Sequence, residues 1–181
     1  MKPITLAAAS ILLFSTAAQS TTLDLTTFTP SIGPSGSVST SSNFANLTAN
    51  SGLSSNVSNV TSFMWDFAAE DYVPYNDYAY FSLNGVSTTL SNVAAVGDYG
   101  NSGWNTYTFA SPFSGNLAFG IDNLLDYELS SQLSVTNVVT NVTSAVPEPE
   151  TYAMMLVGLG LVGFQLRRKS KQSTPPMLGM A

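Results

Sequence analysis

Two polar clusters contain the residue types that could do chemistry in this chain of 181 residues. The first reads Glu70-Asp71-x-x-x-Asn76-Asp77, and the second reads Asp122-Asn123-x-x-Asp126-x-Glu128. Calcium prefers carboxylate and amide oxygens, so the candidate calcium ligands are Glu70, Asp71, Asp77, Asp122, Asp126 and Glu128. Neither cluster has the spacing of the EF-hand loop, and Asp and Asn also form turns by hydrogen-bonding to their own backbone. The sequence leaves both interpretations open: a calcium site, or turns with a solvated surface.

Aromatic residues beside the first cluster indicate a second kind of chemistry, contact with a glycan. Tyr72 and Tyr75 stand in the same Pro-containing loop as the amide and carboxylate of Asn76 and Asp77. Aromatic rings cover the flat C–H faces of sugars, while amides and carboxylates bind the hydroxyls. Trp104 lies on the strand face opposite Tyr107 and Phe109, which should face the core. Its side chain could therefore either pack against the protein or contact a ligand. The candidate glycan-binding residues are Tyr72, Tyr75, Asn76, Asp77 and Trp104.

The composition excludes several function classes. The chain has no Cys and no His, so it has no disulfide, no cysteine nucleophile, no histidine base and no usual zinc ligand set. All five basic residues lie near the ends of the chain, at Lys2, Arg167, Arg168, Lys169 and Lys171. The body between them contains acidic residues but no basic ones, so it lacks the side chains that bind nucleic-acid phosphates. No carboxylate pair is singled out for glycoside hydrolysis, and the sequence predicts a protein that is not an enzyme.

The elements that must position these residues are strands. Residues 63–67, 104–109, 116–121 and 132–139 are β-prone, and residues 22–26 alternate in polarity. Asn84-Gly85 between 78–83 and 86–90 is a strong hairpin signal. The body, residues 21–145, is therefore expected to be all-β, an antiparallel β-sandwich of jelly-roll type. Residues 30–59, rich in Ser, Thr and Asn, are expected to be loosely structured.

The N-terminal residues 1–20 have the outline of a signal peptide. Lys2 precedes an apolar stretch from Ile4 to Phe14, and small residues follow. Cleavage after Ala18 or after Ser20 satisfies the small-residue rule. The alternative is a retained N-terminal anchor, although the apolar stretch is shorter than a spanning helix needs.

The C-terminal residues 146–171 combine three unlike features in order. Val146-Pro147-Glu148-Pro149-Glu150 precedes an apolar run at 152–166, and the basic cluster Arg167-Arg168-Lys169 follows it. Basic residues after an apolar helix favour the cytoplasmic side, so residues 172–181 are expected to be a cytoplasmic tail. The apolar run makes about 22 Å of helix against a membrane core of about 30 Å. We therefore expect a short transmembrane helix that serves as a temporary anchor, the alternative being a permanent one.

This arrangement resembles the PEP-CTERM sorting signal of Gram-negative bacteria. The resemblance implies an exosortase-type membrane protease as a partner. It also implies a protein that is exported, anchored in the inner membrane before processing, and then at the cell surface or extracellular.

A second resemblance covers roughly residues 60 to 140. Phe63-Met64-Trp65-Asp66-Phe67, the loop at 71–78, Gly103-Trp104-Asn105-Thr106-Tyr107-Thr108-Phe109 and Phe119-Gly120-Ile121-Asp122-Asn123 are similar to lectin-like jelly-roll domains that precede PEP-CTERM tails. The resemblance implies a non-catalytic binding module for exopolysaccharide, at the cell surface or in a biofilm matrix. The alternative function is a purely structural acidic surface protein without a specific ligand.

Overall fold

The computed structural model of the protein describes residues 19–125, 128–142 and 149–170. The chain forms two compact units: Ala17–Thr143 is one, and helix α2 (Pro149–Ser170) belongs to the other. Most of the predicted signal peptide, residues 146–148 of the sorting signal and the tail after residue 170 lie outside these ranges.

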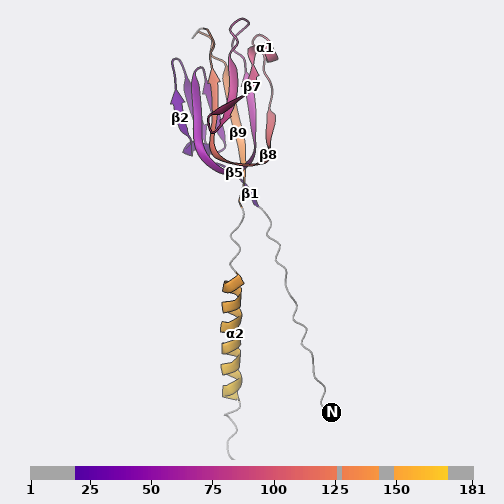
Figure 1. The fold of residues 1–181 in the computed structure, drawn as a ribbon. Helices are drawn as coiled ribbons and strands as arrows, with labels where there is room; N and C mark the ends of the chain where they lie inside the picture. Colours follow the sequence, from indigo (N-terminus) through magenta and orange to yellow (C-terminus); the bar gives the residue numbers. More distant parts are fainter. Residues whose placement is uncertain (1–18, 126–127, 143–148, 171–181) are drawn as a thin grey trace, which may run out of the picture. The chain divides into compact units, whose positions relative to one another are not determined.

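The first unit consists almost entirely of strands (Figure 1). Its elements are β1 (Gln19–Thr22), η1 (Leu25–Thr27), β2 (Thr29–Ile32), β3 (Ser37–Ser41), β4 (Phe44–Thr48), β5 (Ser51–Ala68), β6 (Tyr78–Leu83), β7 (Val86–Asn92), α1 (Val93–Val96), β8 (Asn105–Asp122) and β9 (Gln132–Val142).

Two long strands, β5 and β8, take part in both layers of a sandwich. The first half of β5 pairs with β2 and with the second half of β8, which in turn pairs with β6. The second half of β5 pairs with β9 and with the first half of β8. Register shifts between Val57 and Ser62 mark where β5 bends, as β-bulges do. The result is one layer of β2-β5-β8-β6-β7 and another of β3-β4-β9-β5-β8, with β1 beside β9.

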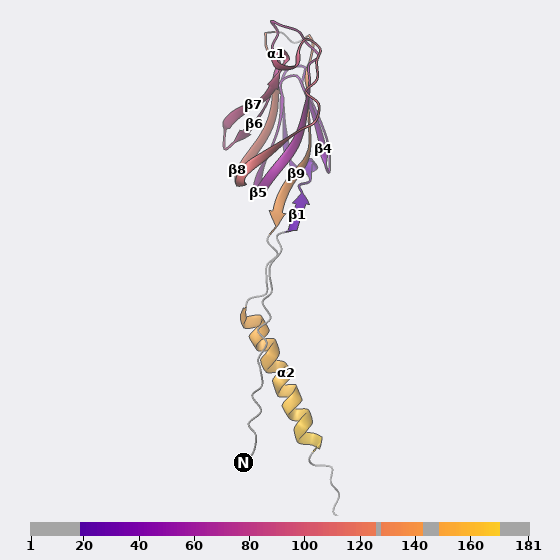
Figure 2. The same ribbon diagram turned by 90° about the vertical axis from the view of Figure 1, so that its right-hand side faces the viewer.

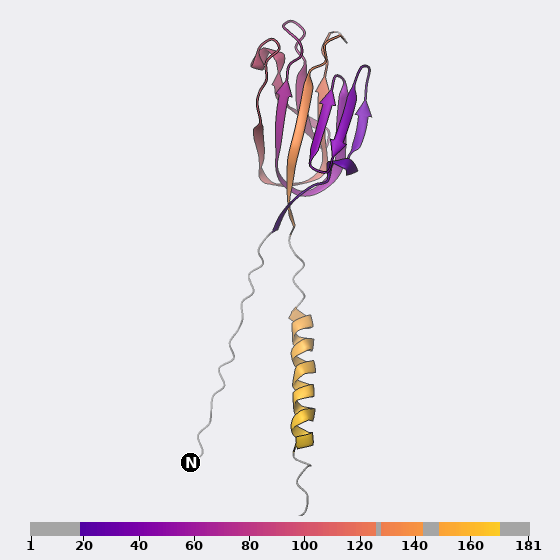
Figure 3. The same cartoon turned by 180° about the vertical axis from the view of Figure 1, so that it is seen from behind.

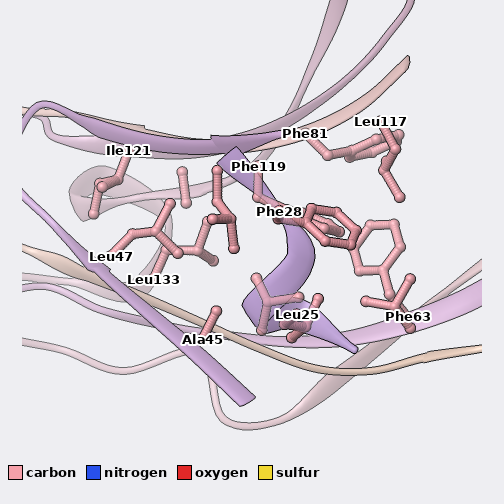
Figure 4. Packing of buried hydrophobic residues seen from close by; sticks show 14 of the residues in the cluster. Leu25, Phe28, Ala45, Leu47, Phe63, Phe81, Leu117, Phe119, Ile121 and Leu133 are labelled. Atoms are coloured by element: carbon pink, nitrogen blue, oxygen red, sulfur yellow. The ribbon is translucent and has the colours of Figure 1, made fainter. Parts of the chain in front are cut away.

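The core fills the space between the two layers (Figure 4). Phe81, Phe119 and Ile121 project from one layer and face Leu47 and Leu133 of the other (Figure 4). Residues two apart along a strand point to the same face, and this alternation supplies the apolar set. The predicted antiparallel β-sandwich is confirmed, without disulfides and with an aromatic-rich core.

The predicted hairpin is also confirmed. Asn84 and Gly85 connect β6 to β7 with φ angles of 51° and 85°, the positive values that a type I′ turn needs. The Asn84 side chain adds support, because its Oδ1 accepts a hydrogen bond from the backbone N of Asn116 at 2.9 Å.

The expectation of a loose segment at residues 30–59 is wrong. The segment contains the end of β2, all of β3 and β4, and the start of β5. Ala45 and Leu47 face the core, while hydroxyls such as that of Thr48 lie toward solvent and bond across strands. Small polar residues therefore form regular strands here, because a few inward apolar side chains and the backbone ladder suffice.

Two predicted strand boundaries also differ from the structure. Residues 22–26 are not a strand: β1 ends at Thr22, and Asp24 caps η1 by accepting a hydrogen bond from the backbone N of Thr26 at 2.9 Å. Residues 105–109 and 116–121 belong to the single strand β8, which passes through Pro112, and residue 104 lies just before it.

Helix α2 confirms the predicted helix over the apolar run, with Arg167 and Arg168 exposed in its last turn. Among the residues that the structure describes, no helix combines the length and apolar character needed to cross a membrane.

Candidate functional site

Three connecting segments meet at the end of the sandwich that carries α1, opposite β1 (Figure 2). They contain Asp77, Val93, and Leu124 with Ser131, and we call this end of the sandwich the loop end. The residue that joins them is Asp77, whose side chain is fully buried. Its carboxylate accepts hydrogen bonds from the backbone N of Leu124 at 2.9 Å and of Ser131 at 3.3 Å. Its carbonyl accepts a third from the backbone N of Val93 at 3.0 Å. The two polar clusters seen separately in the sequence are thus held together by one carboxylate.

Two further acids, Asp71 in this loop and Asp98 after α1, also hold backbone groups. Asp71 is buried, and its Oδ1 accepts a hydrogen bond from the backbone N of Tyr72 at 2.7 Å. Its carbonyl accepts one from Tyr99 N at 2.9 Å, and Asp98 Oδ1 accepts one from Val73 N at 2.9 Å. Backbone N–H groups thus supply the hydrogen-bond partners that a cation would otherwise provide. This explains how a body without Lys or Arg accommodates these acids.

Asn76 has a comparable role. Its Oδ1 accepts a hydrogen bond from the backbone N of Ala94, at 2.8 Å, at the start of α1. The residue before α1, Asn92, caps the same helix by accepting from Ala95 N at 2.8 Å. The amide oxygen of Asn76 and the carboxylate of Asp77 therefore position the loop that carries the tyrosines.

Three tyrosine side chains gather on this braced loop end. We call Tyr72, Tyr75 and Tyr99 the tyrosine cluster. The rings of Tyr72 and Tyr75 lie 5.3 Å apart with 82° between their planes, and Tyr99 lies 6.1 Å from Tyr72. Tyr72 is 39% exposed and Tyr99 is 60% exposed. Sequence reasoning missed Tyr99, although an aromatic residue between Asp98 and Gly100 in a turn is a signal that could have found it.

Trp104 belongs to a different surface. It is 49% exposed, and it packs edge-to-face against Phe44 with ring centroids 6.5 Å apart. Phe44 begins β4 and Trp104 immediately precedes β8. Trp65, by contrast, packs against the core, as expected for a strand residue beside Phe63 and Phe67.

The candidate calcium ligands do not gather in the described part of the chain, which holds no group of three or more acidic side chains suited to a metal ion. Glu70 and Glu128 are exposed, and Asp126 lies outside the described residues. Asp122 accepts a hydrogen bond from the Tyr78 hydroxyl at 2.6 Å. This bond, with a smaller effect of burial, raises the pKa of Tyr78 to about 12. Calcium binding stays a prediction, and the carboxylates of Asp71, Asp77 and Asp122 show a bracing role instead.

Comparison with known proteins gives a structural likeness and a sequence motif. The fold is similar to the N-terminal cellulose-binding domain of β-1,4-glucanase C from Cellulomonas fimi. That likeness has a TM-score of 0.30 and 12% sequence identity, and it covers 64% of this chain and 88% of that one. No curated protein matches the chain.

The C-terminal signal is matched directly. Residues 145–169 match the PEP-CTERM protein-sorting motif, which covers the predicted sorting residues Val146 to Glu150 and Arg167 to Lys169. The chain therefore carries the PEP-CTERM sorting motif, and it is an exported protein that is sorted by an exosortase-type system.

Proposed function

We propose that the protein is a non-catalytic, glycan-binding component of the cell surface or extracellular matrix, and that its tyrosine cluster contacts the glycan. The observation that carries this proposal is the cluster of two exposed rings, Tyr72 and Tyr99, with the half-buried Tyr75 beside them, on a braced loop end. Three adjacent rings offer flat apolar faces together with hydroxyl groups, and a sugar presents the matching combination.

The bracing supports binding because it lowers the entropy that the loop would lose on contact with a ligand. Tyr75 N donates a hydrogen bond to the Tyr72 carbonyl at 2.8 Å, and Tyr99 N donates one to the Asp71 carbonyl at 2.9 Å. The backbone of all three tyrosines is thus fixed by local hydrogen bonds. Tyrosine side chains also have few rotatable bonds, which keeps the cost of ordering them small.

The hydrogen bonds that the carboxylates at the loop end accept support a role without catalysis. A glycosidase of the usual kind needs two carboxyl groups on either side of the scissile bond. In this loop end the carboxylates of Asp71 and Asp77 are buried and accept backbone hydrogen bonds. Calcium, if it binds the outer acids Glu70 and Glu128, would brace the loops further.

Co-sedimentation with the host's own exopolysaccharide tests the proposal. The full-length protein is kept in a detergent without a sugar head group, and binding is measured with calcium and then with a chelator. We expect saturable binding that weakens about tenfold or more in the triple variant Tyr72→Ala, Tyr75→Ala, Tyr99→Ala. Loss of binding in chelator would assign a role to calcium.

The matched control removes an exposed aromatic side chain elsewhere, through Phe44→Ala, and should bind like the wild type. Equal loss in both variants would point to nonspecific adhesion. If the wild-type protein does not bind, the proposal is wrong and a structural surface protein is the remaining interpretation.

A further inference from the structure

The outward face of the layer β2-β5-β8-β6-β7 contains a groove of about 330 Å³, away from the tyrosine cluster. Strand register explains why it is hollow. Ser54, Ala118, Ser82 and Ser87 stand side by side on four successive strands. The neighbouring row contains Gly52 and Gly120. Small side chains thus form a continuous floor that runs across the strands rather than along them.

An aromatic ring limits this floor on one side. Tyr80 projects from β6 opposite Gly120 of β8, and a Cβ atom at Gly120 would collide with the Tyr80 ring. The glycine therefore lets the ring lie across the neighbouring strand. Burial raises the pKa of Tyr80, with a smaller contribution from Asp122. The Tyr78 ring lies 5.9 Å away, held by its hydrogen bond to Asp122.

The chemistry of the groove is that of a polyol site. Its walls present serine hydroxyls, one aromatic face and the single carboxylate of Asp122. All basic residues of the chain lie at Lys2 and between residues 167 and 171, so the groove has no cation to bind a phosphate, sulfate or uronate. A carboxylate without a cation disfavours an anionic ligand.

We propose that this groove binds a single chain of an uncharged polysaccharide, which lies across β2, β5, β8, β6 and β7 with one sugar ring stacked on Tyr80. Five strands at about 4.8 Å spacing span about 19 Å, enough for several sugar rings. The ligand class rests on the proposed function, but the site is separate from the tyrosine cluster and is tested separately.

Isothermal titration calorimetry of the full-length protein, in a detergent without a sugar head group, provides the test. The probes are uncharged hexasaccharides of glucose, mannose and galactose at millimolar concentration, together with hexagalacturonate. We expect at least one uncharged probe to bind and hexagalacturonate not to bind. Asp122→Asn should improve the binding of hexagalacturonate, since it removes the only charge of the groove.

Two variants of the same strand localise the binding. Ala118→Tyr fills the groove floor from an outward position of β8, while Thr108→Tyr adds the same side chain outside the groove. Both positions should accept tyrosine, which suits strands, and thermal unfolding checks the fold. We expect Ala118→Tyr to weaken binding about tenfold or more and Thr108→Tyr to leave it unchanged. Tyr80→Ala should weaken it as well.

The outcomes separate the two sites. If the triple tyrosine variant loses oligosaccharide binding and Ala118→Tyr binds normally, the groove proposal is wrong and the tyrosine cluster is the binding site. Loss in Ala118→Tyr alone would support the groove. The groove proposal is wrong if no uncharged probe binds, or if the protein prefers hexagalacturonate. This holds whatever the result of the co-sedimentation with exopolysaccharide.

Discussion

At the scale of single residues, backbone N–H groups take the place of the missing cations as partners of the carboxylates at the loop end. Asp77 illustrates this, because its buried carboxylate receives two backbone N–H groups from a loop about fifty residues further along the chain. Sequence could predict that acids and tyrosines share a loop. It could not predict which carboxylates turn inward, since that depends on where the loop at 124–131 lies. Tyr99 joins Tyr72 for the same nonlocal reason.

Asp77→Asn should lower the free energy of unfolding by about 2–3 kcal/mol. An amide keeps one acceptor oxygen, and its NH₂ group would then face a backbone N–H donor in a buried position. Denaturant unfolding of the two proteins measures the change. Asp98→Asn is the control, because Asp98 is exposed and should lose less than about 1 kcal/mol. Equal effects of the two substitutions would contradict the bracing role of Asp77.

At the scale of elements, local sequence signals predicted the strands and turns correctly where these depend on contacts between residues close in sequence. The Asn84-Gly85 hairpin was predictable because the turn itself demands positive φ angles. Residues 30–59 were not, because their strands are fixed by partners far away: β4 pairs with β9, and β2 pairs with β5. Figure 3 shows the purple β4 beside the orange β9. The inward residues of 30–59 are too few to produce a clear pattern.

Gly85→Ala should destabilise the protein by about 1–2 kcal/mol, because alanine is strained at a φ of 85°. Thermal unfolding should show a melting temperature lower by several degrees. Gly85→Asn is the matched comparison, since asparagine tolerates the left-handed region, and it should lose less. If both variants melt like the wild type, then the turn contributes little to stability.

At the scale of the whole molecule, the charges are segregated, with cations confined to the two ends of the chain and acids in the exported body. Composition and order alone were enough to predict the sandwich and the sorting motif. The groove was not predictable, because it exists only when five strands are placed in register.

Neutralising the basic cluster through Arg167→Ala, Arg168→Ala and Lys169→Ala should impair sorting. Basic residues after an apolar helix favour the cytoplasmic side, so the variant should lose the preference that we predict for this end of the helix. We expect unprocessed protein to accumulate and the released form to fall, as measured by pulse-chase labelling with cell fractionation. Lys171→Ala, which lies just beyond the matched motif, should be processed normally. Normal release of the triple variant would show that the cluster is dispensable.

The pairing of β1 with the end of β9 has a mechanical consequence. Gln19 lies opposite Val142, so the sandwich is connected to the rest of the chain at one end, while the tyrosine cluster lies at the other. A polymer pulling on the loop end of a protein held by its C-terminal segment would load β9 along its length. The hydrogen bonds of β9 to β4, β5 and β1 would then share the force in shear rather than open one by one. Such an arrangement suits a domain that must stay folded under tension.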